Sequence, residues 1–302
     1  MKVRIGGRGS PLSRAQLDIV ASLLRPAADV EIVAMTTTGD RLSRGEAAMT
    51  GKDLFTREID EALLDGGIDL AVHSLKDLPS RLPDGLAIVA VPLREDPSDV
   101  LVSRGGVTLG ALSRASRVGS SSPRRRAQLL AARPDLFVTE ARGNVDTRLS
   151  RLSEGRWDAI VLARAGLARL RRLEEVTQVL PASLMLPAIG QGALAVVARE
   201  EVGELRELAL SLDHAPSHRE AEAERALLEM LEAGCRAPVA GLARHVERGL
   251  RLSGAAFAPD GSAAIHAEAE GKGDDPAALG REVARQLLDL GAAALLALGR
   301  AP

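Results

Sequence analysis

Short apolar runs and longer mixed segments alternate along most of the chain. Two of the apolar runs, IDLAV at 68–72 and DAIVLA at 158–163, have the length and composition of buried strands. Polar loops and S-P helix-start signals at 10–11 and 122–123 separate these runs. Because strands that alternate with helices are typical of α/β proteins, the pattern predicts α/β domains with mainly parallel sheets.

The pattern of the first half returns in the second half. The same run, S-P-x-x-R-A-Q-L, ends both RIGGRGSPLSRAQL at 4–17 and RVGSSSPRRRAQL at 117–129. A second pair follows in the same order, DGGIDLAV at 65–72 and EGRWDAIV at 154–161. Two such domains in tandem normally enclose a cleft, with ligands near the carboxyl ends of the strands. We therefore expect two similar α/β domains around a ligand-binding cleft.

Two segments have the composition of connections between domains. VPLREDPSD at 91–99 is rich in proline and charge, and LPAIGQGALAV at 186–196 is rich in proline and glycine. The predicted domains are residues 1–92 with 193–212 (domain 1), 98–186 (domain 2) and 215–302 (domain 3). A strand at about 193–199 is expected to return to the first sheet. The smaller α+β domain 3 is expected to contain a helix at about 217–232, strands near 250–257 and 263–270, and a helix at about 276–297.

The composition argues against several classes of function. The 302 residues are 46% apolar, as in soluble globular proteins, and no secretory signal follows the N-terminal MKVRIGG. One cysteine excludes an internal disulfide, and five histidines without ligand spacing argue against a metal site. A net charge of −2 and 1% aromatic residues argue against nucleic-acid binding. We expect a cytoplasmic protein with no metal, no nucleic-acid partner and no membrane partner.

An unusual charge pattern marks the start of the predicted helix at Pro123. Ser122 is a good N-cap, and Pro123 suits the first helical position. Three arginines, Arg124, Arg125 and Arg126, then fill the first turn. Cations in that turn are disfavoured by roughly 0.3–1 kcal/mol each at exposed sites. An anionic ligand at this helix start would reverse the penalty.

Further arginines stand at predicted strand ends and helix starts. They are Arg8 near Ser10, Arg142 and Arg148 on either side of the helix cap Asn144, and Arg169 after DAIVLA. Taken singly, each is more typical of a surface or ion-paired arginine. As a set they form guanidinium forks of the kind that binds carboxylates or phosphates through two hydrogen bonds. The set therefore predicts a ligand with several carboxylate or phosphate groups.

Charged residues also follow the buried strand at 68–72. The residues that emerge at its carboxyl end are His73, Ser74, Lys76 and Asp77. The carboxylate of Asp77 could hold a protonated amine or a pyrrole N–H and stabilise a developing cation. The alternative is that Asp77 only organises the turn before Pro79. His73 is more typical of a packed core histidine.

Two further segments leave their interpretation open. The Gly-rich polar loop at 38–55 suits a mobile lid with Lys52 and Phe55 as its contacts, or a simple exposed linker. Cys235 lies in a predicted loop beside Arg236. A lone cysteine is usually a small buried hydrophobe, whereas a reactive thiol needs exposure and positive surroundings. The residues alone therefore favour an unreactive Cys235.

Eight short motifs follow one another along the chain. They are R-x-S-P-L at 8–12, T-x-G-D at 37–40, G-K-x-L-F at 51–55, AVHSLKDLP at 71–79, RGNVDTRL at 142–149, AGLARL at 165–170, LPAIGQGAL at 186–194 and G-C-R-A-P at 234–238. In this order they resemble the motifs of the porphobilinogen deaminase (hydroxymethylbilane synthase) family of tetrapyrrole biosynthesis. The resemblance runs from Arg4 to about Pro238, with a looser C-terminal remainder. One such motif is weak evidence, but eight in sequence are strong.

The resemblance implies an activity and a ligand. The family joins four porphobilinogen molecules head to tail, with loss of ammonia, into linear hydroxymethylbilane. Each monomer carries an acetate and a propionate, which agrees with the arginine set. The growing chain is built on a dipyrromethane cofactor attached by a thioether to a loop cysteine, and Cys235 matches that cysteine. The resemblance therefore reverses the interpretation that the residues alone favour for Cys235.

The resemblance also implies roles for the candidate residues. Asp77 matches the catalytic aspartate, which binds pyrrole N–H groups, assists loss of the amine and stabilises the azafulvenium cation. Cofactor carboxylates are expected at Lys76, Ser122, Arg124, Arg125 and Arg148. Substrate carboxylates are expected at Arg8, Ser10, Arg142 and Arg169. Lys52 and Phe55 would lie on the lid, with Phe55 over the reacting rings.

The family's organisation agrees with the internal repeat. Its members have a three-domain α/β fold whose first two domains look like periplasmic binding proteins, and its precedent is a monomer whose product passes to a cyclising synthase. Three positions depart from the family pattern, namely Gly7 and Ser120 in place of threonines, and Ala48 in place of a lysine. Nothing catalytic is lost by these changes.

Two other functions compete with this one. A two-domain anion-binding receptor would explain the repeat and the arginines, but needs neither an adduct on Cys235 nor a catalytic Asp77. Binding of a phosphate backbone is opposed by the net charge and the scarcity of aromatic residues. A covalent pyrrole adduct on Cys235 would separate the enzyme from both alternatives.

Overall fold

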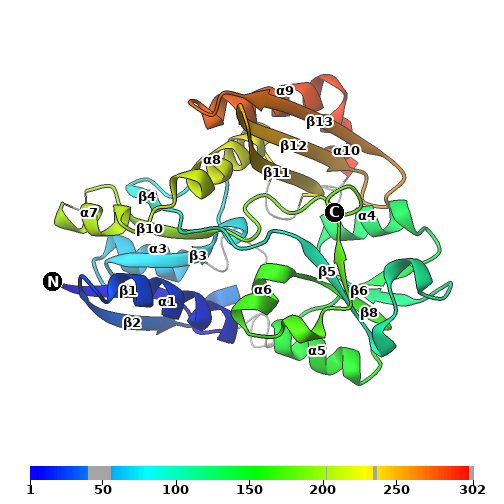
Figure 1. The fold of residues 1–302 in the computed structure, drawn as a ribbon, viewed down its shortest axis with the longest axis horizontal. Coiled ribbons are helices and arrows are strands. Elements are labelled where there is room, and N and C mark those ends of the chain that lie inside the picture. The colour runs from blue at the N-terminus through cyan, green and yellow to red at the C-terminus, as the bar shows by residue number, and fades with distance from the viewer. Residues whose placement is uncertain (40–55, 202, 234–236, 299–302) are drawn as a thin grey trace. The chain divides into compact units, whose positions relative to one another are not determined.

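The computed structural model describes residues 1–39, 56–201, 203–233 and 237–298 (Figure 1). The chain divides into two compact units, Met1–Glu95 with Ala193–His218, and Asp96–Gly192 with Arg219–Pro302. Within the described residues, no helix is long and apolar enough to cross a membrane. The division into three domains at the predicted boundaries stays a prediction.

A five-stranded sheet with the order β2-β1-β3-β10-β4 forms the centre of the first unit (Figure 1). The strands are β1 (Lys2–Arg8), β2 (Asp29–Met35), β3 (Leu70–Ser74), β4 (Leu86–Ala90) and β10 (Leu194–Arg199). The helices are α1 (Pro11–Leu24), α3 (Arg57–Leu64) and α7 (Glu204–Leu210), and the 3-10 helix η1 (Leu75–Asp77) follows β3. Because β10 runs antiparallel to β3 and β4, the returning strand expected at about 193–199 is confirmed.

Helix α1 shows why these residues form a helix against the sheet. Ser10 caps its start and Pro11 occupies the first turn, as the S-P signal predicts. Leu17, Val20 and Leu24 recur at helical spacing and are fully buried. They pack with apolar residues of β1 and β3 in one hydrophobic cluster, so that α1 is fixed along the strands.

The first sheet of the second unit repeats this order as β7-β6-β8-β5-β9. Its strands are β5 (Asp99–Ser103), β6 (Arg117–Gly119), β7 (Phe137–Thr139), β8 (Ala159–Ala163) and β9 (Gln178–Leu180). Its helices are α4 (Pro123–Ala132), α5 (Val145–Ser153) and α6 (Arg164–Arg169), with the 3-10 helices η2 (Arg104–Gly106), η3 (Leu109–Ala111) and η4 (Leu173–Glu175). β6 pairs in parallel with β7 and β8, whereas β5 is antiparallel to β8 and β9. Each sheet therefore contains one antiparallel strand, β10 in the first and β5 in the second, whose direction the prediction of mainly parallel sheets did not include.

The sequence repeat is also a repeat of hydrogen bonds. In the first unit the backbone N–H of Arg4 donates to the Asp69 carboxylate at 2.7 Å, and Asp69 N–H donates back to Arg4 O at 2.9 Å. In the second unit Arg117 and Asp158 make the same two bonds at 2.7 and 2.9 Å. The prediction of two similar α/β halves is confirmed by this equivalence together with the common strand order.

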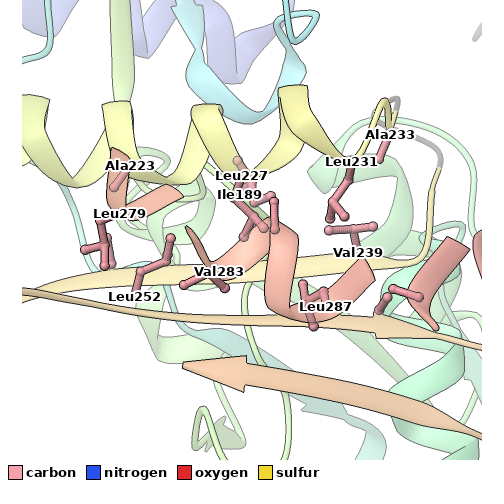
Figure 2. Close-up of a cluster of buried hydrophobic side chains, with 14 of the residues drawn as sticks. Ile189, Ala223, Leu227, Leu231, Ala233, Val239, Leu252, Leu279, Val283 and Leu287 are labelled. Carbon is pink, nitrogen blue, oxygen red and sulfur yellow. The ribbon is translucent and has the colours of Figure 1, made fainter. Parts of the chain in front are cut away.

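A three-stranded antiparallel sheet, β11 (Val239–Val246), β12 (Gly249–Phe257) and β13 (Ala264–Gly271), belongs to the second unit. Helices α8 (Ala215–Met230), α9 (Pro276–Asp289) and α10 (Ala292–Leu298) complete the C-terminal region. Figure 2 shows Leu227 of α8 and Val283 and Leu287 of α9 meeting Leu252 and Val239 of the strands in one buried cluster. The expected α+β composition of this region is thereby confirmed.

Two details of the C-terminal region differ from expectation. Strand β11 was not predicted as a separate strand, and the single helix expected at about 276–297 is broken into α9 and α10. The break lies at Gly291, which has a φ of 96°. Glycine takes this left-handed conformation without steric cost, and it therefore ends α9.

The C-terminal sheet also contacts helix α4. Alternate residues of the strands, Ala240, Ala255 and Phe257, form a buried cluster with Ala127 of α4 and with Leu186. The two faces of the sheet therefore have different neighbours, α8 and α9 on one and α4 on the other. This packing joins the C-terminal region to the helix that carries the three arginines.

Candidate anion-binding and catalytic residues

The start of α4 has the cap that the sequence predicts. Ser122 Oγ accepts a hydrogen bond from the backbone N–H of Arg125 at 3.4 Å, and Pro123 occupies the first turn. The three arginines that follow differ in burial, since Arg124 is 3% exposed and Arg125 is 7% exposed. Arg126 is exposed instead, and its guanidinium donates to the backbone carbonyl of Val138. Two of the three arginines are therefore directed into the protein.

A buried carboxylate, Asp99 at the start of β5, faces both buried arginines. Arg125 Nε and Nη2 donate to Asp99 Oδ1 at 2.9 and 2.7 Å. Arg124 Nη1 lies 2.8 Å from Asp99 Oδ2 and donates to Leu186 O at 2.6 Å. The dipole penalty at this helix start is thus offset in part by a carboxylate of the chain itself, which the sequence analysis missed.

The charges of this cluster do not cancel. Burial raises the pKa of Asp99, but the charges of Arg124 and Arg125 outweigh burial and lower that pKa to about 2. Burial also lowers the pKa of Arg124, a change that Asp99 opposes and Arg125 reinforces. Two guanidinium groups face one carboxylate, so one positive charge remains. Arg124 Nε is buried and makes no hydrogen bond within the described part of the chain. An excess cation with an unused donor is the chemistry of an anion site.

The other predicted arginines of the second unit lie at different depths. Arg142 is exposed and pairs with Glu140 at 2.7 Å, just before the cap of α5. Arg148 is half-buried in α5, whose N-cap is Asn144 as predicted. Arg169 ends α6 and donates to Gly192 O at 2.6 Å. The structure thus brings Ser122, Arg124 and Arg125 together directly, whereas these other three stand on separate elements.

The carboxyl end of β3 presents Lys76 and Asp77 on η1. Backbone bonds fix this turn, since Leu75 N–H donates to Ala193 O at 3.0 Å and Leu78 N–H donates to Leu75 O at 3.2 Å. Lys76 is half-buried and Asp77 is exposed. The carboxylate of Asp77 is therefore held by a rigid backbone and accessible to a ligand.

His73 lies just before this turn and is 5% exposed, as expected for a core histidine. Burial, and after it the positive charge of Arg8, lower the pKa of His73 from 6.5 to about 4. Its Nε2 has no hydrogen-bond partner in the described ranges. The imidazole is therefore neutral near pH 7 and adds no charge beside Asp77.

The S-P helix start of the first unit carries Arg8 and Ser10. Arg8 is the last residue of β1 and is half-buried, and Ser10 Oγ accepts from Ser13 N–H at 3.3 Å. Gln16 of α1 donates to Ser74 Oγ at 2.7 Å and so ties the helix to the end of β3. Gln16 was not singled out by the sequence analysis, although it belongs to the shared S-P-x-x-R-A-Q-L run.

Gln128, the glutamine of the second copy of this run, likewise ties its helix to another segment of the chain. Gln128 donates to Leu186 O at 3.1 Å and accepts from Leu186 N–H at 2.7 Å. The repeat was thus the signal that could have identified both glutamines. Three predicted residues, Lys52, Phe55 and Cys235, lie outside the described residues.

Comparisons with known proteins match almost the whole chain. Residues 3–207 match the model of the porphobilinogen deaminase dipyromethane cofactor binding domain, and residues 218–289 match that of the porphobilinogen deaminase C-terminal domain. The chain belongs to the porphobilinogen deaminase family. The porphobilinogen deaminase of Desulforudis audaxviator is 47% identical over 99% of this chain and 98% of its own length. That of Rubrobacter xylanophilus is 48% identical over 98% of this chain and 97% of its own length.

A likeness to a solved structure accompanies these sequence matches. The methionine binding protein MetQ superposes with a TM-score of 0.46 and 14% identity over 74% of this chain and 94% of its own. Membership of the porphobilinogen deaminase family disfavours the receptor interpretation, since the curated relatives at this identity are named as deaminases. It also makes dipyrromethane the cofactor of the matched N-terminal region.

The residues present fit such a cofactor. Dipyrromethane carries carboxylate side arms, and the cluster of Arg124, Arg125 and Asp99 retains one uncompensated positive charge beside a buried unused N–H. A carboxylate would complete both the charge and the hydrogen bond of this cluster. The fit thus rests on the donor set of the site, and it is independent of the motif match.

Proposed function

We propose that this chain condenses four porphobilinogen molecules head to tail, with loss of ammonia, to give linear hydroxymethylbilane in tetrapyrrole biosynthesis. The observation that carries the proposal is the similarity over nearly the full chain to porphobilinogen deaminases at 47–48% identity. The excess positive charge beside Asp99 supports it, because substrate and product both carry carboxylates.

Asp77 is proposed as the catalytic carboxylate. Each condensation removes an amine and develops positive charge on the pyrrole that remains. An exposed carboxylate on a fixed turn can accept hydrogen bonds from pyrrole N–H groups and stabilise that charge. The neighbouring His73 is compatible with this role, because its imidazole is neutral near pH 7 and adds no positive charge of its own beside Asp77.

The dipyrromethane cofactor, when bound, supplies the nucleophilic pyrrole carbon on which the new chain begins. We propose that its carboxylates are held by Arg124 and Arg125 at the start of α4, with Ser122, Lys76 and Arg148 as further donors. The proposed roles of these last three rest on the motif match and on their half-buried positions on η1, at the cap of α4 and in α5. Cys235 is proposed as the thioether attachment residue.

Arg8, Ser10, Arg142 and Arg169 are proposed to bind the carboxylates of the incoming substrate. Arg142 is the most accessible of the proposed arginines of the second unit, and its guanidinium pairs with Glu140 at the surface. Surface ion pairs are worth at most about 1 kcal/mol, so that a substrate carboxylate can replace Glu140 at little cost. Lys52 and Phe55 are proposed as lid contacts.

We further propose that the enzyme is a cytoplasmic monomer whose product passes to a cyclising synthase. The low aromatic content and the net charge of −2 support the expectation that it binds neither nucleic acid nor membrane. The proposed domains are residues 1–92 with 193–212, 98–186 and 215–302. The three sheets, one within each proposed domain, support this division.

The mass of the denatured intact protein tests the proposal. We expect the purified chain to exceed its sequence mass by two linked pyrrole units, and Cys235→Ala to weigh as its bare sequence. Conversion of porphobilinogen should be present in the first protein and absent from the second. A bare-chain mass in both proteins, without turnover in either, would contradict the proposed function and return the receptor interpretation.

A further inference from the structure

Asp99 is the most deeply buried charged group of the cluster that it forms with Arg124 and Arg125, and the proposed reaction assigns it no role. It is 0% exposed and begins strand β5. Its Oδ1 accepts three hydrogen bonds, two from Arg125 at 2.9 and 2.7 Å and one from Gln191 Nε2 at 2.9 Å. Its Oδ2 lies 2.8 Å from Arg124 Nη1. One carboxylate therefore fixes the positions of both guanidinium groups.

The guanidinium groups of this cluster are enclosed by the protein. The side chains of Arg124 and Arg125 are 4% and 8% exposed. Burial of a charge without a counter-charge is strongly destabilising, because the protein cannot replace the lost hydration. Removal of Asp99 would leave two buried cations where there is now an excess of one. The carboxylate is therefore the internal counter-ion on which the folded cluster depends.

The cluster also holds the two segments that join the units. Gln191 Nε2 donates to Pro97 O at 2.6 Å and to Asp99 Oδ1 at 2.9 Å. The chain passes from one unit to the other between residues 95 and 96 and again between 192 and 193. Pro97 and Gln191 lie within two residues of these boundaries, so that the two hydrogen bonds of Gln191 tie the segment that carries Pro97 and Asp99 to the segment before the second crossing.

We propose that Asp99 is a positioning residue that orients Arg124 and Arg125 for ligand carboxylates and replaces those carboxylates when no anion is bound. The inference rests on the proposed function, because it assigns the ligand carboxylates to the dipyrromethane cofactor. Asp99 touches neither substrate nor reacting atoms. It acts through the two arginines, and its charge matters most when no cofactor is attached.

The inference predicts that loss of the Asp99 charge harms the apoprotein more than the holoprotein. Asp99→Asn keeps the shape of the side chain and one acceptor oxygen for Arg125 and Gln191. It removes the charge and places an amide NH2 opposite Arg124 Nη1 in place of Oδ2, and the buried cluster then contains two uncompensated cations. A bound cofactor would supply carboxylates near these cations and restore part of the balance. A residue with a purely structural role would instead lower the stability of both forms equally.

Thermal unfolding of four proteins tests this prediction. They are the unmodified chain, Asp99→Asn, Cys235→Ala and the double variant with both changes. We expect Asp99→Asn to lower Tm by roughly 10 °C in the Cys235→Ala background and by less than half of that in the chain that carries the adduct. Equal losses in the two backgrounds would overturn the inference. As a control, Asp135→Asn, which breaks the surface pair with Arg133, should lower Tm equally in both.

A charge-compensating variant keeps the test decisive if Asp99→Asn destabilises the apoprotein too far to be purified. Arg124→Gln, added to Asp99→Asn and Cys235→Ala, returns the cluster to one excess positive charge. We expect this triple variant to unfold at a higher temperature than the double variant, or to be soluble where the double variant is not. A further loss of stability on adding Arg124→Gln would show that packing, and not charge, is what Asp99 provides.

Intact mass separates failure of this inference from failure of the proposed function. An adduct on the unmodified chain with equal Tm losses would retain the function and reject the role of Asp99. A bare-chain mass for the unmodified chain would reject the function whatever the Tm values are. In that second outcome no cofactor is attached to either protein, and the unmodified chain differs from Cys235→Ala only by a sulfur atom. The proposed role of Asp99 toward the cofactor is then overturned together with the proposed function.

Discussion

The indole ring of Trp157 lies directly against the backbone of Gly119. A β carbon added to Gly119 would be 2.8 and 2.9 Å from two ring atoms of Trp157, closer than real contacts allow. In the other half of the repeat, Ile68 covers Gly6 in the equivalent position, with a closest distance of 2.3 Å to such a β carbon. In each half, therefore, the first repeated motif packs against the second, through Gly6 and Ile68 in one half and through Gly119 and Trp157 in the other.

Gly119→Ala should therefore destabilise the protein by about 1–3 kcal/mol, because the rigid ring of Trp157 cannot move aside without displacing its neighbours. Gly6→Ala should cost less, because the atoms nearest to it belong to the flexible ends of Ile68 and Met35. Urea unfolding of the two variants would measure the difference. Gly110→Ala is the control, since nothing lies within 4 Å of its added β carbon. A larger loss for Gly6→Ala than for Gly119→Ala would contradict this account.

The repeat explains why much of the fold could be predicted. The S-P caps at Ser10 and Ser122 and the buried strands before Asp77 and Arg169 are local features, and each was found where the sequence placed it. Strand β11 was missed because its sequence, VAGLARHV, is poor in the residues that favour strands. The formation of β11 depends on its pairing with β12 and on its packing against α8, and both are tertiary contacts.

The candidate site was only partly predictable for the same reason. Three arginines in one helical turn are visible in the sequence, but which of them point inward depends on the position of the helix against the sheet. Arg126 lies outside and Arg124 and Arg125 lie inside, next to a carboxylate 25 residues earlier in the chain. Asp99 had one weak signal, a charge at the start of the apolar run DVLVS. A buried counter-ion at such a distance along the chain has no local pattern.

Asp77→Asn should reduce turnover by roughly 10²–10⁴-fold while the adduct on Cys235 remains in place. The amide still accepts a hydrogen bond from a pyrrole N–H, but it cannot balance the positive charge that develops when the amine leaves. Steady-state conversion of porphobilinogen, together with intact mass, would measure both properties. Asp84→Asn changes an exposed aspartate of the following loop and should leave turnover unchanged. Full activity of Asp77→Asn would remove this residue from the mechanism.

His73 should make the stability of the protein depend on pH. Its pKa falls from 6.5 to about 4 on folding, so the unfolded chain binds a proton in this range that the folded chain does not. The stability that the protein gains by keeping this imidazole neutral is present in full above pH 6.5 and is lost as pH falls toward 4. The total loss in the free energy of unfolding is at most about 3 kcal/mol.

His73→Leu should flatten this part of the curve, because the variant has no imidazole to protonate in the unfolded chain. Urea midpoints measured at several pH values between 6.5 and 4 would show the difference from the unmodified protein. His266→Gln, at an exposed position of β13, should leave the slope as it is. The same slope in His73→Leu and in the unmodified protein would show that other groups cause it.

Glu224 of α8 should hold in place the segment that precedes β10, through a hydrogen bond to its backbone. It is 0% exposed, and its two oxygens accept the backbone N–H of Gly190 at 2.6 Å and of Ala243 at 2.8 Å. Glu224→Gln places an amide group opposite one of these donors and leaves a buried N–H unsatisfied. We expect a loss of roughly 1–3 kcal/mol in the free energy of unfolding.

The matched control for Glu224 is Glu222, an exposed carboxylate on the same helix. Glu222→Gln should change the free energy of unfolding by no more than about 0.5 kcal/mol. Hydrogen exchange gives a second measurement, since the amides of Gly190 and Ala243 should lose protection in Glu224→Gln but not in Glu222→Gln. If both variants kept that protection, the carboxylate of Glu224 would not be what holds this segment to β11.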